Sequence, residues 1–194
     1  MFEKVLIANR GAIACRILRT LRDLQVQGVA VYSEADAASL HILHADEAHS
    51  LGEGAAAGTY LAVDKILAIA KSTGATAIHP GYGFLSENAA FAQACAAADI
   101  AFIGPTPEQL RVFGLKHTAR ALAKQHGVPM LEGTELLDSL DAALIAGEQV
   151  GYPVMLKSTA GGGGIGMRVC RSAAELSESF EAVKRLGQNN FSDA

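Results

Sequence analysis

The 194-residue sequence contains no tryptophan, and aromatic residues make up only 6% of it. Charged residues are also few, at 19%, and no apolar run approaches the roughly 18 residues of a membrane span. The net charge of −4 argues against binding to nucleic acid or to an anionic membrane surface. Half of the residues are hydrophobic, which predicts a folded core and argues against long-range disorder. The length suits one domain, or one domain and part of another.

Cysteine is also scarce. The three cysteines, Cys15, Cys95 and Cys170, lie far apart, and the sequence has no C-x-x-C motif. This pattern argues against a disulfide framework and a zinc knuckle, and it favours three small buried side chains in a reducing compartment. The first residues lack the layout of a signal peptide, so we expect a cytoplasmic protein.

The first hundred residues alternate between two kinds of segment. Short apolar runs predict strands, and apolar residues at helical spacing predict helices between them. The predicted strands are 4–8, 29–32, 48–51, 75–78 and 101–103, and the predicted helices are 13–24, 60–72 and 87–98. The pattern predicts an α/β fold with an open parallel sheet.

The pattern changes after Gly104 and Pro105. Helices are predicted at 106–113, 116–126 and 138–150, then strands at 154–158 and 166–170, and a last helix at 172–186 that Ser172 caps with Glu175 three residues on. We expect a first domain at 1–113, a helical linker at 114–135 and part of a second domain at 136–194. A two-stranded hairpin is only marginally stable alone, so the second domain is expected to continue beyond Ala194.

A glycine loop is the strongest local signal. Four glycines, Gly161, Gly162, Gly163 and Gly164, follow Lys157 and precede Gly166 and Met167. Free backbone amides in such a loop can bind phosphate oxygens, and a lysine at the strand end can reach the same group. The motif is neither a Walker A loop nor a dinucleotide fingerprint. The alternative interpretation is a flexible hairpin connection.

Two further loops follow predicted strands. The turn Asn9-Arg10-Gly11 lies where ligands bind in open α/β sheets, although taken alone it is better explained as an ordinary turn with a structural glycine. The segment 79–88, HPGYGFLSEN, combines two glycines, a proline and two aromatics. Ser86 is predicted to cap the following helix, with Glu87 in its first turn. A rigid turn without a binding role is the alternative.

One histidine pair has a spacing that a metal site would suit. His41 and His44 lie three residues apart and precede Asp46 and Glu47. A solvated helical face is the favoured interpretation, so we expect no metal ligands in this chain.

Several segments together resemble the biotin carboxylase component of biotin-dependent carboxylases. Residues 7–14 match its I-A-N-R-G-E-I-A stretch, with Ala12 in place of the acidic residue, and 79–88 match H-P-G-Y-G-F-L-S-E-N without change. Residues 103–105 match I-G-P, and Lys116 aligns with a lysine of a G-D-K segment. Residues 151–167 match G-Y-P-V-x-x-K-A-x-x-G-G-G-G-R-G-M, with Ser158 for alanine and Ile165 for arginine.

The resemblance implies a Rossmann-like (pre-ATP-grasp) domain followed by part of an ATP-grasp domain. It implies that ATP phosphorylates bicarbonate and that the carboxyl group passes to biotin on a carrier domain, with Mg²⁺ as cofactor. Lys116, Lys157, the loop glycines, Gly166 and Met167 are implied to bind ATP. A loop on the bicarbonate or biotin side is implied at His79, Gly81, Tyr82, Gly83, Phe84 and Glu87. The metal-binding carboxylates and the catalytic residues are expected beyond Ala194, and the whole protein is expected to form a homodimer.

The departures from the family pattern indicate one branch. The segment 114–117 (GLKH), Ile165 and the stretch 186–191 (LGQNNF) resemble urea carboxylase of urea amidolyase, which implies urea as carboxyl acceptor. The alternatives are a biotin carboxylase of an acyl-CoA carboxylase, another ATP-grasp ligase such as carbamoyl-phosphate synthase, and a non-catalytic folding or interaction unit.

Overall fold

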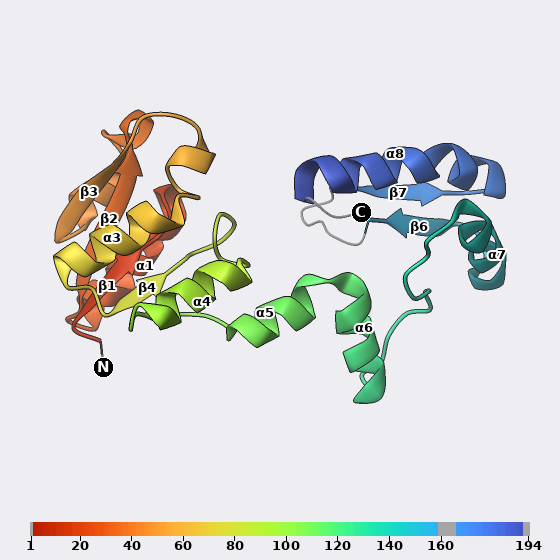
Figure 1. Ribbon diagram of the computed structural model, residues 1–194, viewed down its shortest axis with the longest axis horizontal. Coiled ribbons are helices and arrows are strands. Elements are labelled where there is room, and N and C mark those ends of the chain that lie inside the picture. Colours follow the sequence, from red (N-terminus) through yellow and green to blue (C-terminus); the bar gives the residue numbers. More distant parts are fainter. Residues whose placement is uncertain (1, 159–165, 192–194) are drawn as a thin grey trace. The chain divides into compact units, whose positions relative to one another are not determined.

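The chain consists of two compact units, Met1–Arg111 (unit 1) and Val112–Ala194 (unit 2). The computed structural model describes residues 2–158 and 166–191, and side chains up to residue 186 (Figure 1). Helix α5 (Pro107–Gly114) crosses the boundary between the units.

A five-stranded parallel sheet forms the centre of unit 1, which confirms the predicted α/β class. Its strands are β1 (Lys4–Ile7), β2 (Gln27–Ser33), β3 (Glu47–Gly52), β4 (Ala77–His79) and β5 (Ala101–Phe102), in the order β3-β2-β1-β4-β5. The direction of strand succession reverses between β1 and β4. In open parallel sheets the ligand crevice lies at such a switch point, beside the carboxyl ends of the strands.

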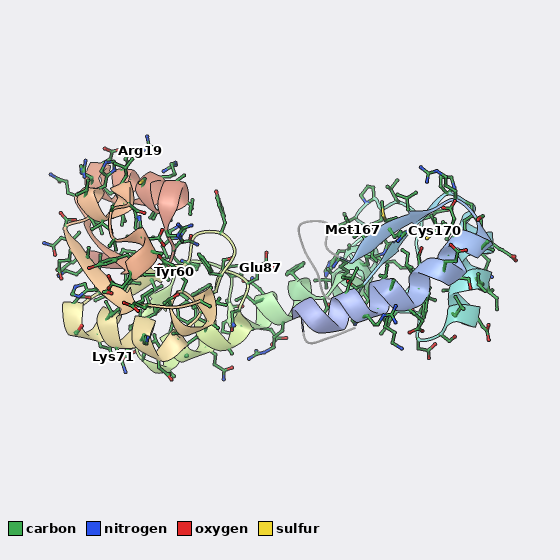
Figure 2. All side chains as sticks on the ribbon, turned by 90° about the horizontal axis from the view of Figure 1, so that it is seen from above. Arg19, Tyr60, Lys71, Glu87, Met167 and Cys170 are labelled. Carbon is green, nitrogen blue, oxygen red and sulfur yellow. The ribbon has the colours of Figure 1, made fainter. Side chains whose placement is uncertain are left out.

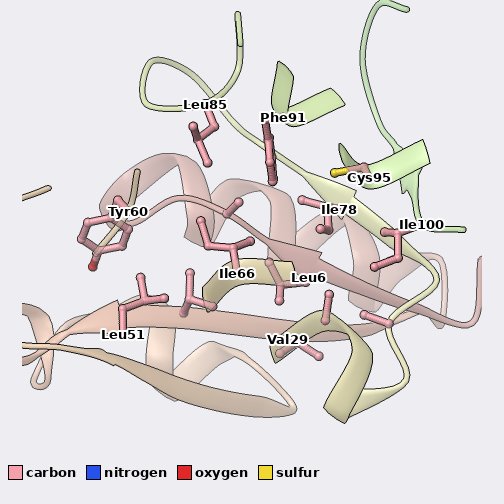
Figure 3. Packing of buried hydrophobic residues seen from close by; sticks show 14 residues of the cluster. Leu6, Val29, Leu51, Tyr60, Ile66, Ile78, Leu85, Phe91, Cys95 and Ile100 are labelled. Atoms are coloured by element: carbon pink, nitrogen blue, oxygen red, sulfur yellow. The ribbon is translucent and has the colours of Figure 1, made fainter. Parts of the chain in front are cut away.

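Helices cover both faces of this sheet. Helix α1 (Gly11–Asp23) lies on one face, where Ile17, Leu18 and Leu21 pack against Val5 and Ile7. Helices α3 (Val63–Thr73) and α4 (Ala89–Ala97) contribute to the core on the other face, which Figure 3 shows with Tyr60 at one end of the cluster. This core includes Leu6, Val29, Ile66, Ile78, Phe91 and Cys95. The continuous apolar runs of β1 and β2 are therefore buried from both sides, as parallel strands require.

The cap of α4 differs from the prediction. Asn88 caps this helix, and its side-chain oxygen accepts from the Phe91 N–H at 2.9 Å. Ser86 is therefore not the cap, and Glu87 lies in the loop before the first turn. Asn is as good a cap as Ser, and its position next to the first helical residue is the one the bond requires.

Three short helices lie between the longer elements: η1 (Glu34–Asp36), α2 (Leu40–His44) and η2 (Ala56–Gly58). The solvated face predicted for His41 is wrong, because its side chain is fully buried and its Nε2 lies 3.2 Å from the Val31 carbonyl oxygen. Burial lowers the pKa of His41. Within residues 2–158 and 166–191, no three His, Cys, Asp or Glu side chains gather as a metal site requires.

The cysteines follow the predicted burial in two cases of three. Cys95 and Cys170 are buried, whereas Cys15 is half-buried, and all three are free thiols. Burial raises the pKa of Cys95 to about 11, so its thiol stays protonated at neutral pH.

Unit 2 contains α6 (Lys116–Gln125), α7 (Leu140–Val150), an antiparallel hairpin of β6 (Val154–Lys157) and β7 (Met167–Cys170), and α8 (Ala173–Phe191). Its buried core consists of Ala143, Cys170, Leu176 and Phe180, with Leu156 and Tyr152 packed against it. Ser172 Oγ accepts from the Glu175 N–H at 3.3 Å, which confirms the predicted cap of α8. No helix in the described part of the chain is long and apolar enough to cross a membrane.

Candidate functional site

One side of the unit 2 hairpin carries exposed apolar side chains. The register pairs Met155 with Val169 and Lys157 with Met167, and residues paired in this way share one side of the sheet. Met155, Met167 and Val169 are 48%, 42% and 43% exposed, whereas Leu156 packs against the core from the opposite side. Met155, Lys157, Met167 and Val169 are called the hairpin face below. Figure 2 labels Met167 at the start of β7. The hairpin face is an apolar surface that ends in an ammonium group.

A second lysine lies within electrostatic range of this surface. Lys116 is the first residue of α6 and is half-buried. Burial lowers the pKa of Lys116, and the positive charge of Lys157 lowers it further. Two ammonium groups that repel each other form a local excess of positive charge. An anionic group between them would be bound by both charges.

A backbone hydrogen bond lies at the loop end of the hairpin. The Ser158 N–H donates to the Gly166 carbonyl at 2.9 Å. Gly166 has a φ of +73°, and a Cβ at this position would overlap Ser158 Oγ and lie 3.2 Å from Ser158 Cβ. Glycine is therefore required at position 166. The predicted phosphate-binding glycines, Gly161, Gly162, Gly163 and Gly164, lie outside the described residues.

In unit 1, the loop after β4 is fastened to the turn after β1. Asn9 is buried, and its side-chain amide donates to the Pro80 carbonyl at 2.7 Å and to the Tyr82 carbonyl at 2.8 Å. Gly81 has a φ of +66°, and a Cβ there would lie 2.7 Å from Asn9 Nδ2. The two predicted loops thus meet at the switch point of the sheet.

The predicted residues of the β4 loop divide into exposed and inward-facing groups. Tyr82 is 76% exposed, and Glu87 is also exposed. His79 Nδ1 accepts from the Gly81 N–H at 3.0 Å, and burial lowers the pKa of His79. A ligand at this edge would meet Tyr82 and Glu87, whereas His79 stabilises the shape of the loop.

A buried carboxylate beside this loop was not among the predicted site residues. Asp36 Oδ2 accepts from Arg10 Nε at 2.7 Å and from the Tyr60 hydroxyl at 2.6 Å, and Asp36 Oδ1 accepts from Arg10 Nη2. These bonds, with that to Arg10 foremost, hold the pKa of Asp36 well below its usual range. The Tyr60 ring stacks on Phe84, with centroids 4.9 Å apart and planes at 19°. Arg10, Asp36 and Tyr60 are too far apart in sequence for a local motif to identify them.

Comparison with family models identifies the family of the chain. Residues 1–110 match the family model described as "Biotin carboxylase, N-terminal domain". The chain belongs to the biotin carboxylase family. Residues 116–194 match the model described as "Carbamoyl-phosphate synthase L chain, ATP binding domain". The resemblance noted from the motifs is thereby confirmed.

Biotin carboxylase relatives occur in several branches at similar identity. The chain is 51% identical to "Biotin carboxylase" of Halalkalibacterium halodurans over 100% of its own length and 43% of the relative. It is 50% identical to "Methylcrotonoyl-CoA carboxylase subunit alpha, mitochondrial" of Mus musculus, covering 98% of this chain and 27% of the relative. It is also 50% identical to "Urea amidolyase" of Lachancea kluyveri, covering 100% of this chain and 10% of the relative. The chain thus spans less than half the length of each of these relatives.

Solved biotin carboxylase structures share the fold. The Campylobacter jejuni biotin carboxylase–β-γ-ATP complex is 39% identical, with a TM-score of 0.96, over 100% of this chain and 44% of the other. The biotin carboxylase domain dimer of Hydrogenobacter thermophilus 2-oxoglutarate carboxylase, in complex with MgADP, ADP and bicarbonate, is 41% identical, with a TM-score of 0.95, over 100% and 43%. These neighbours confirm the predicted fold class.

Proposed function

We propose that this chain forms the N-terminal domain and part of the nucleotide-binding lid of an ATP-dependent biotin carboxylase. The observation that carries the proposal is that Lys157, at the end of the apolar hairpin face, lies near enough for its charge to lower the pKa of Lys116. In this function ATP and bicarbonate are substrates, and biotin on a carrier domain receives the carboxyl group.

The residues present fit a nucleotide. An apolar sheet surface suits the flat face of a nucleobase, and the two lysines suit its phosphates. Met155, Met167 and Val169 would contact the base, and Lys116 and Lys157 would bind phosphate oxygens. We assign the same phosphate-binding role to Gly161, Gly162, Gly163, Gly164 and Gly166, from the family motif.

Phosphoryl transfer depends mainly on positioning and on electrostatic stabilisation. When bound, ATP supplies the phosphoryl group that activates bicarbonate, and Mg²⁺ neutralises its negative charge. Lys116 and Lys157 hold the phosphates and stabilise their charge. We assign the metal ligands and the groups that move protons to the part of the relatives' sequences that this chain does not span.

Tyr82 and Glu87 are assigned to the bicarbonate or biotin side. They are exposed at the switch point of unit 1, where open α/β sheets bind ligands. We also propose a homodimer for the whole protein, since the Hydrogenobacter thermophilus domain is described as a dimer.

A chimera tests the proposed function. This chain replaces the matched residues of the Halalkalibacterium halodurans biotin carboxylase, and bicarbonate-dependent ATP hydrolysis and carboxylation of free biotin are measured. Activity close to that of the parent enzyme is expected. A folded chimera without either activity would contradict the proposal, and it would favour the non-catalytic alternative.

Urea is the proposed final carboxyl acceptor. The support is the sequence at 114–117, Ile165 and 186–191, which resembles the urea carboxylase branch. The test reads the coding sequence beyond codon 194 and assays the encoded protein with biotin and bicarbonate. Urea is expected to stimulate ADP release, and acetyl-CoA or propionyl-CoA is not. Stimulation by an acyl-CoA alone would assign the chain to an acyl-CoA carboxylase.

A further inference from the structure

The carboxylate of Asp36 is held by an unusually complete set of donors. Besides Arg10 and Tyr60, Ser33 Oγ donates to Oδ2 at 3.1 Å and Ser39 Oγ donates to Oδ1 at 3.4 Å. The Asp36 side chain is only 6% exposed. A buried charge with one partner is costly, whereas a charge with this many donors is fixed in a single position.

Tyr60 transmits this fixed position to the β4 loop. Its hydroxyl donates to Asp36 Oδ2 and accepts from the Ser33 N–H at 3.0 Å, so both hydrogen-bonding directions of the phenol are used. The ring itself is buried and stacks on Phe84. Tyr60 therefore presents to the loop a flat surface that two hydrogen bonds hold in place.

Phe84 needs such a support. Its φ is +43°, a conformation that a bulky residue rarely adopts. The Phe84 side chain stays 38% exposed, and the neighbouring Leu85 is buried. The stack on Tyr60 therefore offsets part of the cost of this backbone conformation, and loss of the stack would release the loop at Phe84.

The turn after β1, which contains Asn9 and Arg10, thus holds the β4 loop at two places. Asn9 binds the Tyr82 carbonyl directly, and Arg10 reaches Phe84 through Asp36 and Tyr60. Tyr82 is exposed, its own carbonyl is one anchor, and the second anchor lies two residues further on, at Phe84.

We propose that Asp36 and Tyr60 are positioning residues that hold Phe84 in its strained conformation and so set the place of Tyr82 for the biotin-side substrate. Their effect on substrate rests on the proposed function, whereas their effect on the loop does not. Neither residue is proposed to touch substrate.

The loop itself is tested in the 194-residue chain by fluorescence. Because the sequence has no tryptophan, Phe84→Trp introduces a single reporter at the stack. Tyr60→Phe removes the bond to Asp36 and keeps the ring, and Tyr32→Phe is the matched control, since Tyr32 takes no part in the Asp36 network. Loss of the bond is expected to raise the population of the released loop about fivefold, seen as stronger acrylamide quenching. Quenching that is equal in Tyr60→Phe and Tyr32→Phe would overturn the proposal.

The effect on substrate is tested in the chimera, with native Phe84. Tyr60→Phe and Asp36→Asn are expected to raise the KM for free biotin about fivefold, with the KM for ATP and kcat changed less than about twofold. Equal increases in both KM values would indicate general destabilisation and overturn the positioning role. Stronger quenching with an unchanged biotin KM would support the hold on Phe84 and overturn the biotin-side assignment of the loop. An inactive parent chimera would contradict the proposed function alone, because the fluorescence result still decides the hold on Phe84.

Discussion

Replacing Gly166 with alanine tests how the β6–β7 hairpin is closed. The residue has a φ of +73°, which costs an L-residue about 1–2 kcal/mol. The added Cβ also overlaps Ser158 Oγ, and overpacking of this kind costs about 1–3 kcal/mol. Together these effects lower the free energy of opening the β6–β7 hairpin by about 3 kcal/mol.

Hydrogen exchange of the β6 and β7 amides measures this change. In Gly166→Ala, exchange of these amides is expected to become up to about a hundredfold faster. The acceleration cannot exceed the protection that the same amides have in the unsubstituted chain. The double variant Ser158→Ala/Gly166→Ala removes the overlapping hydroxyl and keeps the unfavourable φ, so about tenfold faster exchange is expected.

The control is Gly114→Ala, where a Cβ would meet nothing within 4 Å. Its exchange in β6 and β7 is expected to match that of the unsubstituted chain. Unchanged exchange in Gly166→Ala would refute the requirement for glycine. Equal exchange in the single and double variants would show that Ser158 Oγ contributes nothing to the effect.

Three further outcomes are expected. Burial lowers the pKa of His41 and His79 below their ordinary value of 6.5, so the unfolded chain binds more protons than the folded chain below about pH 6.5. The free energy of unfolding of unit 1, measured by urea titration, is therefore expected to decrease as the pH is lowered below about 6.5. The decrease is expected to be smaller in His41→Leu. Asn9→Ala removes two bonds to the β4 loop and is expected to destabilise unit 1 by about 1–3 kcal/mol in the same titration at pH 7.5, and an effect below about 0.5 kcal/mol would contradict the anchor. The isolated 194-residue chain is expected to show no bicarbonate-dependent ATP hydrolysis, and measurable bicarbonate-stimulated ADP release would contradict the assignment of the metal ligands to residues it does not span.

Local sequence pattern was sufficient for much of unit 1. The apolar runs at β1, β2 and β4 predicted buried parallel strands because strands covered on both faces need no polar side chains. The family motif at 79–88 located the β4 loop, and the predicted Ser172 cap was confirmed because capping depends on neighbours in sequence.

Tertiary contacts explain what the pattern missed. His41 lies in a five-residue helix, which is too short for periodicity to distinguish its buried side, and its ring fits against β2. Asp36 and Tyr60 meet although 24 residues separate them, and only the fold brings them together. The repulsion between Lys116 and Lys157 also depends on tertiary structure, because the two residues begin and end different elements.

The ATP dependence of lysine variants tests the central claim most directly. In the active chimera, Lys116→Ala and Lys157→Ala are compared with Lys184→Ala, which removes an exposed lysine of α8. A charge-assisted bond to phosphate contributes about 1.5–3 kcal/mol, so the KM for ATP is expected to rise about ten- to a hundredfold in the first two variants. In Lys184→Ala, the KM for ATP is expected to stay within about threefold of that of the unsubstituted chimera. Normal ATP kinetics in both Lys116→Ala and Lys157→Ala would contradict the nucleotide site.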